Sequence, residues 1–528
     1  MMKALFLLIF CFPFFSLNAQ SNFQNVMGNS GNFYQINSMT RGPQGHYYIA
    51  GVTNSSSVQK KDGILVILND SGLKISTADF GNSGNDELFT IKFLSDGRYA
   101  MVGSTESFTS GSSDTSNIFF IIMEGQGLSI NKMKCPGTIF KEEGRDFTET
   151  FDHQFVISGS IELPGRGKDV FVIKLDSTGQ PLWGIAYGTS IYNEVANSII
   201  ETPDHGYMVA GYSFGFSVYK YPYLLKINEN GAVQWANSYS FNTAVTPDRY
   251  FNKIIYGYNN DYILAGTDGT GSVGAREQFL LSVDGSGNSN WMKRYTLNAN
   301  AGEGKDVAKS ADGGFILGGT MGINYASLVK TDSVGNYQWS MIYPELGAGF
   351  NSQGNAVVSL SDSSFALGGA MIAGDTLAYL VKTDLNGVTN CHSEFLQFAI
   401  SSPLIASVLI NTLPDTMMLS LNNPFAATLD SLIWFNTNLC ALTDVANTEI
   451  KVGTVNCLVV HSYLQFSLVG TGDEIEKIKC FDLMGRNRAT NEWPKNEIDV
   501  SSWTPGIYIY KLKTKSGSIF NGKFYISK

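Results

Sequence analysis

Seven copies of one β-strand pattern follow one another between Asn32 and Ile400, and this repetition constrains the fold more than any other feature of the chain. Each copy holds an aromatic or apolar run that ends on a glycine, here named the closing glycine, and then an apolar strand with a turn that also ends on glycine. The closing glycines are Gly51, Gly103, Gly159, Gly211, Gly266, Gly319 and Gly369, spaced 52, 56, 52, 55, 53 and 50 residues apart. A strand-rich repeat of this length is typical of small sheets stacked side by side.

The sixth copy shows what one repeat contains. It reads KDVAKSA, a turn at 312–314, FILGGT, a loop, YASLVKT, a turn at 332–335 and NYQWSMIY. Four strands joined by short turns predict one twisted antiparallel sheet, the blade of a β-propeller. Twelve residues before each closing glycine the residue is always apolar, as packing between adjacent blades requires: Met39, Ile91, Phe147, Ile199, Ile254, Val307 and Val357. The sequence therefore predicts an all-β chain with a seven-bladed propeller.

Two further features bear on how the blades join. A tryptophan stands four residues after the turn glycine in four copies, and we expect these side chains to be structural, at Trp183, Trp235, Trp291 and Trp339. A ring also needs a contact between its first and last blades, because an open ring would leave strand edges exposed. Residues 22–28 resemble a fourth strand without the three before it. We expect them to complete or extend blade seven and so close the ring.

The N-terminus has the pattern of a secretory signal. Lys3 supplies a positive start, an apolar run follows, and Leu17-Asn18-Ala19 forms a cleavage site before Gln20. No later stretch has the roughly 20 apolar residues that a membrane-spanning helix needs. We therefore expect an exported chain without a transmembrane segment, divided into a signal peptide (1–19), a propeller (20–400), a β-rich connector (401–446) and a C-terminal domain (447–528).

Charge and cysteine content exclude some partners and leave one question open. The net charge is −10 and no basic stripe occurs, so the sequence argues against nucleic acid and against an anionic membrane surface. Without the signal segment five irregularly spaced cysteines remain: Cys135, Cys391, Cys440, Cys457 and Cys480. Cys391 with Cys440, or Cys457 with Cys480, could pair in an oxidising compartment. Buried free thiols are the equal alternative.

From about Glu449 the pattern changes to alternating strands and turns, which predicts a small β-sandwich of Ig-like type. Residues 449–528 resemble the type A C-terminal sorting domain of the type IX secretion system of Bacteroidota. The matching segments are FDLMGR, IDVS, GIY and a final strand with lysines, which contain Asp482, Gly485, Arg486, Asp499, Gly506, Tyr508, Lys523 and Lys528. The usual Tyr-Pro-Asn-Pro opening is replaced by Gly453-Thr454-Val455-Asn456, so the start of the domain departs from the pattern.

The resemblance implies a route out of the cell. The signal peptide would deliver the chain to the periplasm, and the type IX translocon would carry it across the outer membrane. A sortase would then remove the tail and attach the protein to surface lipopolysaccharide, or release it. The expected location is thus the cell surface or the medium.

Motifs for catalysis and cofactors are missing from the sequence. The five histidines, at positions 46, 153, 205, 392 and 461, show no spacing suited to zinc, and we expect none to recur across blades. No GxSxG, phosphate-binding loop or dinucleotide fingerprint stands in a suitable context. Residues 174–183 resemble the tryptophan-docking motif of quinoprotein dehydrogenases, without the cofactor site of that family. We expect no metal, no cofactor and no catalytic residue. Four aspartates recur at one turn and are expected to hold its geometry: Asp176, Asp284, Asp332 and Asp384.

Two features suggest a binding face. The residues fourteen positions before the closing glycines would meet at the channel mouth, and six of the seven are polar: Asn37, Phe89, Arg145, Asn197, Asn252, Lys305 and Asn355. A loop of blade four adds aromatic residues that could stack on sugars or anchor a protein: Tyr212, Phe214, Phe216, Tyr219 and Tyr221. In the alternative interpretation the asparagines satisfy buried strand ends and the aromatics cover the rim of the blade.

Three functions remain open from the sequence. The first hypothesis is a binding or adhesion module for a glycan or a protein, exported by the type IX system. The second is an extracellular hydrolase or lyase that acts on polysaccharide, since propellers host such sites and fold does not determine function. The third is a structural component of the cell surface.

Overall fold

The computed structural model describes residues 22–526 except for several internal segments, and the fold below is that of the described residues. The segments left out are 29–31, 55–59, 109–115, 126, 190–191, 215–218, 242–247, 270–275, 297–301, 322–324, 345–350, 390–392, 396–398, 403–404, 410–412, 418–419, 423–434, 439–453, 461–462, 470–473, 483–486, 493–496, 504–505 and 517–518. The expected signal peptide thus lies outside the described residues. Within them, no helix is long and apolar enough to cross a membrane.

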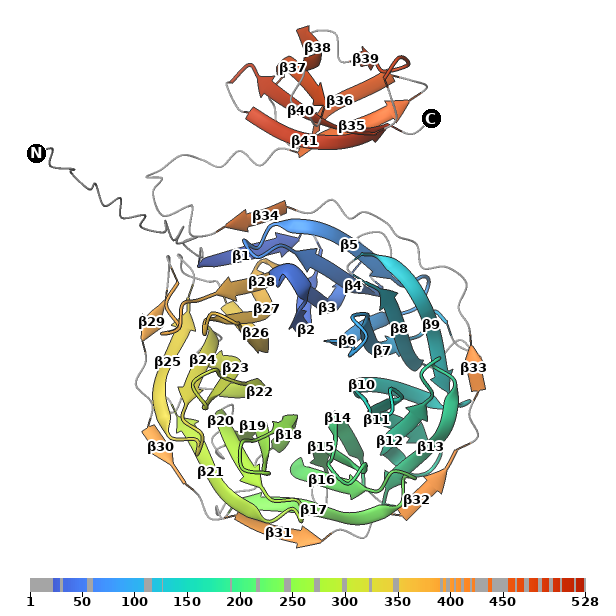
Figure 1. The fold of residues 1–528 in the computed structure, drawn as a ribbon, viewed down its shortest axis with the longest axis vertical. Helices are drawn as coiled ribbons and strands as arrows, with labels where there is room; N and C mark the ends of the chain where they lie inside the picture. Colours follow the sequence, from blue (N-terminus) through green and yellow to red (C-terminus); the bar gives the residue numbers. More distant parts are fainter. Residues whose placement is uncertain are drawn as a thin grey trace, which may run out of the picture. The chain divides into compact units, whose positions relative to one another are not determined.

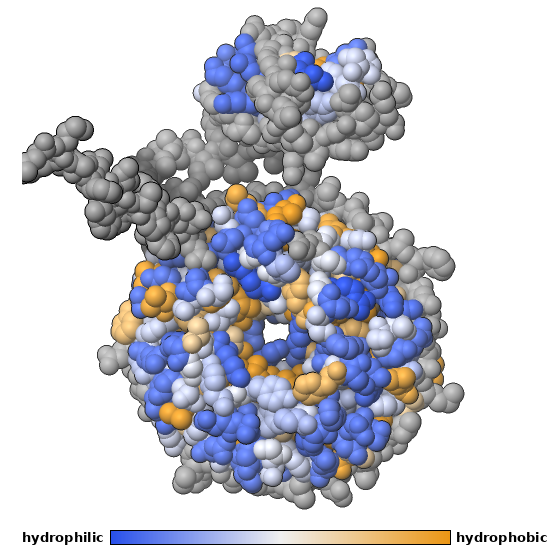
Figure 2. Space-filling view, viewed as in Figure 1, coloured by the Kyte–Doolittle hydropathy of each residue, from blue (hydrophilic) through white to orange (hydrophobic). Residues whose placement is uncertain are grey.

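The chain forms two compact units, residues 1–443 and 444–528. In the first unit seven antiparallel sheets stand around a common centre as the blades of a propeller (Figure 1). Figure 2 shows a narrow opening through the middle of this ring. Each of blades one to six is built from four consecutive strands, listed from the innermost strand outwards.

Blade one contains β2 (Tyr34–Arg41), β3 (Tyr47–Asn54), β4 (Lys61–Leu68) and β5 (Lys74–Phe80). Blade two contains β6 (Asp86–Phe93), β7 (Tyr99–Thr105), β8 (Asn117–Glu124) and β9 (Ser129–Gly137). Blade three contains β10 (Lys141–Glu149), β11 (Phe155–Leu163), β12 (Gly167–Leu175) and β13 (Pro181–Gly188). Blade four contains β14 (Glu194–Glu201), β15 (Tyr207–Ser213), β16 (Tyr221–Ile227) and β17 (Val233–Phe241).

Blade five contains β18 (Arg249–Tyr256), β19 (Tyr262–Gly269), β20 (Arg276–Val283) and β21 (Ser289–Thr296). Blade six contains β22 (Gly302–Lys309), β23 (Phe315–Met321), β24 (Tyr325–Thr331) and β25 (Tyr337–Tyr343). Blade seven takes β26 (Asn351–Ser359), β27 (Phe365–Ala373) and β28 (Asp375–Lys382) from its own repeat. Its fourth strand is β1 (Phe23–Gly28) from the N-terminus.

The ring closes as the sequence predicts. Strand β1 pairs antiparallel with β28, with Phe23 opposite Lys382. Its side chains also contact blade one, where Asn25 Nδ2 donates a hydrogen bond of 3.0 Å to the carbonyl of the turn glycine Gly72. The first and last blades are therefore joined by main-chain pairing on one side and by side-chain contact on the other.

Packing between blades follows the apolar column seen in the sequence. All seven of its residues are buried, with at most 6% of the residue exposed. Each packs on the middle strands of the preceding blade; Ile254, for example, shares a cluster with Met208 and Ala210 of blade four. Seven such clusters lie between neighbouring blades and make up the core of the ring as far as the structure describes it.

A second contact between blades explains the repeated tryptophans and turn glycines. The turn glycine Gly287 has a φ of +79°, and a Cβ there would lie 2.8 Å from the Trp235 ring of the preceding blade. Beside it Tyr239 donates a hydrogen bond of 2.8 Å to the Gly287 carbonyl. The same Trp and Tyr pair docks on Gly231, Gly335 and Gly387. The prediction of a structural role is confirmed, although these tryptophans are half-buried rather than fully buried.

The aspartates of the same turns also act as predicted. Asp284 Oδ1 accepts hydrogen bonds of 2.9 Å from the backbone N–H groups of both Ser286 and Asn288. The equivalent bonds occur in three other blades, at Asp176, Asp332 and Asp384. These carboxylates hold turn geometry, as the sequence indicates.

The segment after blade seven wraps around the outside of the ring as a belt (Figure 1). Its strands are β29 (Glu394–Phe395), β30 (Ala399–Ser401), β31 (Ile405–Leu409), β32 (Leu413–Thr416), β33 (Ser420–Asn422) and β34 (Phe435–Asn438). They pair antiparallel with the outermost strands of blades six, five, four, three, two and seven, in that order. The belt thus runs against the order of the blades, and it begins inside the segment that the sequence assigned to blade seven.

The second unit is a small β-sandwich, as expected. One sheet contains β35 (Thr454–Val460), β36 (Tyr463–Val469) and β39 (Glu497–Asp499). The other contains β38 (Asn487–Glu492), β37 (Ile475–Asp482), β40 (Gly506–Thr514) and β41 (Ile519–Ile526). Phe466, Ile478, Trp503 and Leu512 are buried together between them.

The residues that carry the sorting-domain resemblance fall mainly at strand ends. Asp482 and Asp499 end β37 and β39, Gly506 begins β40, Tyr508 is buried, and Lys523 lies in β41. Gly485, Arg486 and Lys528 lie outside the described residues. Among the cysteines, Cys135 is a buried free thiol in β9, whereas Cys391 and Cys440 are not described.

Candidate functional site

The closing glycines create the candidate site. At each of them a Cβ atom would overlap the backbone carbonyl oxygen of the residue sixteen positions earlier, on the innermost strand of the same blade. Only glycine admits this close approach. The innermost strand is bulged directly beyond the contact, and the residue without a partner is always the one fourteen positions before the closing glycine. A bulge redirects a side chain out of the regular alternation of a strand.

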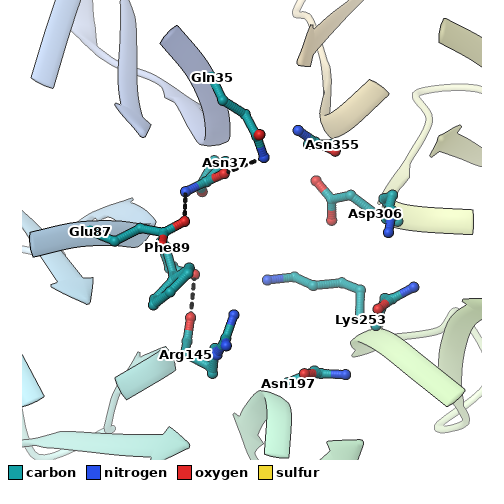
Figure 3. A pocket seen from close by; sticks show the side chains of 13 residues that line it. Gln35, Asn37, Glu87, Phe89, Arg145, Asn197, Lys253, Asp306 and Asn355 are labelled. Carbon is teal, nitrogen blue, oxygen red and sulfur yellow. Dashed lines mark hydrogen bonds between the residues drawn. The ribbon is translucent and has the colours of Figure 1, made fainter. Parts of the chain in front are cut away.

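The seven bulged residues meet at one end of the channel. They line a cavity of about 280 Å³, which also touches Gln35, Ser38, Glu87, Thr90, Lys253 and Asp306. Figure 3 shows these side chains arranged in a ring, with Lys253 reaching toward its middle. The sequence correctly places all seven residues together, from Asn37 to Asn355. Their role in binding remains a prediction.

The asparagines of this ring tie each blade to the next. Asn37 Nδ2 donates to the Leu88 carbonyl at 2.9 Å, and Asn355 Nδ2 donates to the Ile36 carbonyl at 2.9 Å across the closure of the ring. Asn197 and Asn252 make the same bond to the following blade, at 2.7 and 2.6 Å. The amide nitrogens therefore have the structural role that the alternative interpretation gave them, but their partners are the carbonyls just before the bulge of the next blade and not strand ends. The Asn37 amide oxygen accepts a hydrogen bond of 3.0 Å from Gln35 Nε2. The amide oxygens of Asn197, Asn252 and Asn355, which also line the cavity, accept none from the described residues.

Two cations of the ring are held at its rim by carboxylates that each serve two partners. Arg145 lies 4.1 Å from the centre of the Phe89 ring and 2.8 Å from Glu143, which also contacts Lys168 at 3.4 Å. Lys305 Nζ lies 2.5 Å from Glu303, which also pairs with Arg276. Burial lowers the pKa of Lys305. Because each carboxylate is shared between two cations, one positive charge of each group is not neutralised. Arg145 and Lys305 are the cations of these groups that line the cavity.

A buried charge network lies next to the bulges. Asp146, with 1% of its side chain exposed, contacts Lys92 at 2.7 Å and Lys253, from across the channel, at 3.2 Å. Burial opposes ionisation of Asp146, but Lys253 and Lys92 hold its pKa well below the usual range. Burial raises the pKa of Asp306, and Lys253 offsets part of this effect. The network fixes Lys253 in the channel.

Sequence reasoning missed this network although a signal was present. The residue thirteen positions before the closing glycine is polar in six of seven copies, at Ser38, Thr90, Asp146, Ser198, Lys253 and Asp306. Four of these side chains accept a hydrogen bond from a backbone N–H group of the next blade. Asp306, for example, accepts one of 2.9 Å from Val357 N. The polar residues beside the bulges therefore form hydrogen bonds between neighbouring blades. In blades three and five they also form the ion pair of Asp146 with Lys253 in the channel.

The aromatic loop of blade four forms a separate cluster on the same face. Lys220 Nζ lies 4.6 Å from the ring centre of Tyr212 and 5.2 Å from that of Tyr250. Phe214 contacts Tyr212 edge to face, and 41% of Tyr219 is exposed. Of the five aromatics, Phe216 lies outside the described residues and the other four do not line the cavity: Tyr212, Phe214, Tyr219 and Tyr221.

The expectation about histidines is wrong. His153 and His205 both stand six residues before a closing glycine, in blades three and four. Each occupies the left-handed position of the turn between the first two strands, with φ of 58° and 61°. Among the described residues, no group of three or more His, Cys, Asp or Glu side chains is arranged as metal ligands.

Comparison with known proteins finds solved structures that resemble this chain only distantly, at low sequence identity. No protein-family model and no curated protein matches this sequence. An extracellular domain assigned to a hybrid two-component system of B. thetaiotaomicron matches with 10% identity and a TM-score of 0.36; the match covers 94% of this chain and 56% of that one. A Penicillium chrysogenum α-L-arabinanase complexed with arabinobiose matches at 11% identity and TM-score 0.39, over 70% of this chain and 99% of that one. An ulvan lyase matches with 9% identity and a TM-score of 0.42, over 67% of this chain and 96% of that one. At these values none of the likenesses bears on activity, and the seven-bladed description rests on the strand order of the chain itself.

Proposed function

We propose that this protein is an exported propeller, on the cell surface or in the medium, that binds a glycan or a protein at its channel mouth. The observation that carries the proposal is the cavity of about 280 Å³ lined by the bulged residue of every blade. Its lining combines cationic donors with amide oxygens, so it offers both kinds of hydrogen-bonding group. A ligand rich in hydroxyl or peptide groups would pair with both, and a few convergent polar groups in a concave site are typical of ligand pockets.

The decisive experiment presents the full-length mature chain to a glycan array and a panel of polysaccharides. Retention of a glycan supports a binding module, and cleavage of a polysaccharide supports an enzyme. If the chain neither retains nor cleaves any member of the panel, the result supports a structural component. The double variant Arg145→Ala with Lys305→Ala should lose the ligand that binds in this cavity. In this variant both carboxylates keep a cation, because Glu143 retains Lys168 and Glu303 retains Arg276.

A matched control exists in the same ion pairs. Lys168→Ala with Arg276→Ala removes the same net charge from the same two carboxylates, but neither residue lines the cavity. It should bind as the wild type does. If both double variants lose binding equally, the loss is caused by the lower positive charge of the rim as a whole. That result would contradict a site in the cavity.

The second candidate, a hydrolase or lyase acting on polysaccharide, draws support from one observation. Asp306 is a carboxyl group that lines the cavity and whose pKa burial raises, as suits a general acid. However, Asp306 accepts hydrogen bonds from the backbone N–H groups of Val307 and Val357 on its two oxygens. Binding is therefore the first proposal, and the cleavage measurement on the panel tests the second.

For delivery we propose the type IX secretion system, with its translocon and sortase as partners of the tail and surface lipopolysaccharide as the anchor. The support is the sorting-domain resemblance of residues 449–528, together with a tail that has a core of its own. Deleting 449–528 should leave a folded propeller in the periplasm. Finding the truncated chain at normal levels on the surface or in the medium would contradict this route.

A further inference from the structure

A pentapeptide recurs at the end of the ring opposite the mouth. Blade three reads Glu-Thr-Phe-Asp-His at 149–153, and blade four reads Glu-Thr-Pro-Asp-His at 201–205. Both form the turn that follows the innermost strand, β10 or β14, whereas the bulged residues Arg145 and Asn197 lie in the middle of these strands. The residue six positions before the closing glycine has positive φ in all seven blades, so this conformation belongs to the turn itself: Gly45, Gly97, His153, His205, Asn260, Gly313 and Ser363. Two adjacent blades thus place histidine where blades two and six have Gly97 and Gly313.

The two histidines are oriented in the same way. His153 Nδ1 lies 3.2 Å from Glu149, and His205 Nδ1 lies 3.6 Å from Glu201. Because Nδ1 faces the carboxylate, Nε2 at the other side of each ring is the group presented outward. The side chains are 68% and 61% exposed, and no hydrogen bond joins either Nε2 to a described residue.

The glutamates themselves are already engaged by the chain. Glu149 accepts hydrogen bonds from Ser95 N at 2.7 Å and from Ser95 Oγ at 2.6 Å. Glu201 accepts one from Phe151 N at 2.8 Å, and only 8% of its side chain is exposed. Each glutamate thus fastens the turn of the preceding blade and aligns its own histidine. Little of either carboxylate is left for a ligand.

Between the two pairs lies an exposed aromatic residue. Phe151 is 67% exposed, and its ring contacts His205 edge to face at 5.5 Å. It separates two adjoining cavities of about 470 and 360 Å³, which share Phe151 and Glu201 as lining residues. Tyr256 lines the first cavity and Tyr207 the second. We name this surface the turn groove.

We propose that the turn groove binds a neutral oligosaccharide, with a sugar ring on Phe151 and hydroxyl groups on Nε2 of His153 and His205. An exposed aromatic face beside directed polar groups matches the apolar face and hydroxyl edge of a pyranose. Carboxylates outnumber the single Lys174 among the lining residues, which disfavours a polyanion. A basic peptide would find Glu149 and Glu201 occupied by donors of the chain and would depend on Asp152 and Glu229, and the measurement with hexalysine below tests that partner. This site is independent of the proposed function of the mouth.

The test uses the full-length mature chain and neutral hexasaccharides of glucose (α-1,4, β-1,4 and β-1,3), mannose and xylose, with binding measured by saturation-transfer NMR and titration. Phe151→Ala should weaken binding by about tenfold, the effect expected on losing one stacking contact. Phe151→Trp should preserve it. The matched control is Phe395→Ala, which removes a phenylalanine that is 58% exposed on the belt.

A second pair of variants tests the histidines without straining the turn. His153→Asn and His205→Asn introduce the residue that blade five carries at this position, where Asn260 has a φ of 57°. Each should weaken binding severalfold at unchanged stability. The mouth variant Arg145→Ala with Lys305→Ala should bind these hexasaccharides normally, which separates this proposal from the previous one.

Three outcomes would overturn the proposal. Equal affinities of Phe151→Ala and Phe395→Ala would move the ligand elsewhere. Binding of hexalysine in place of every hexasaccharide would assign the turn groove to a basic partner. Absence of any bound hexasaccharide at millimolar concentration would show that the turn groove serves only the packing of the turns.

Discussion

Replacing Tyr239 by phenylalanine removes one hydroxyl group and leaves the ring between blades four and five in place. In the native chain this hydroxyl donates to the Gly287 carbonyl at 2.8 Å, and both residues are buried. The substitution makes no cavity, so its cost is the lost bond and a buried acceptor left without a partner. We expect the free energy of unfolding to fall by about 1–2 kcal/mol.

The same geometry occurs at three other junctions, which permits a stricter test. Tyr187, Tyr295 and Tyr343 donate at 2.7, 2.8 and 2.9 Å to the turn glycine of the following blade. The four hydroxyls belong to different junctions and share no partner, so their effects should add. The quadruple variant should lose about 4–8 kcal/mol, which is four times the effect of one lost bond.

Urea unfolding followed by tryptophan fluorescence measures these losses. The control is Tyr262→Phe, a tyrosine only 5% exposed whose hydroxyl makes no hydrogen bond to a described residue. If Tyr239→Phe and Tyr262→Phe have the same midpoint, the docking bond contributes nothing and the reasoning fails. A quadruple variant no less stable than the single ones would refute the independence of the junctions.

Three further predictions follow from the fold. Trp235→Ala should cost about 2 kcal/mol, below the range for a fully buried tryptophan because this ring is half-buried; an unchanged urea midpoint would contradict the docking role. Gly211→Ala should abolish the soluble, folded chain or shift its near-ultraviolet circular dichroism, since the added Cβ overlaps the Val195 carbonyl, and a native spectrum would show that the bulge does not need glycine. Burial raises the pKa of Glu142 to about 7, partly offset by Thr138, so its contribution to stability is full below pH 4.5 and declines as pH rises to 7. Glu142→Gln should remove a decline of about 3 kcal/mol from the plot of stability against pH, and parallel plots would argue against it.

The blade count is predictable because its cause is local. The closing glycine is required by a carbonyl that crosses directly over it, so every blade must repeat the residue and the sequence displays the period. The same contact produces the bulge, and counting back fourteen residues therefore finds the lining of the mouth. Closure by residues 22–28 is predictable for a similar reason, since blade seven lacks a fourth strand of its own.

The belt could not be predicted because its pairing is made by backbone groups. Strands such as β29 and β33 are too short to show an alternation of side chains. Nothing in their composition states which blade edge they meet. The contact of Asp146 with Lys253 is likewise hidden, because it joins blades three and five across the channel at a separation of 107 residues. The turn groove shows in the sequence only when the copies are aligned on their closing glycines, since its two histidines then occupy one column.

The belt also determines when this molecule can become complete. Strand β1 is synthesised first, yet Val26 pairs with Tyr379, so the earliest strand must wait for almost the whole ring before it finds its partner. The belt strands come later still, and each needs a finished blade to pair with. Contacts between such distant parts of a chain make folding slow. A chain that ends before Glu394 would therefore expose the unpaired backbone groups of its outermost strands to other molecules. Exposed strand edges of this kind are templates for aggregation.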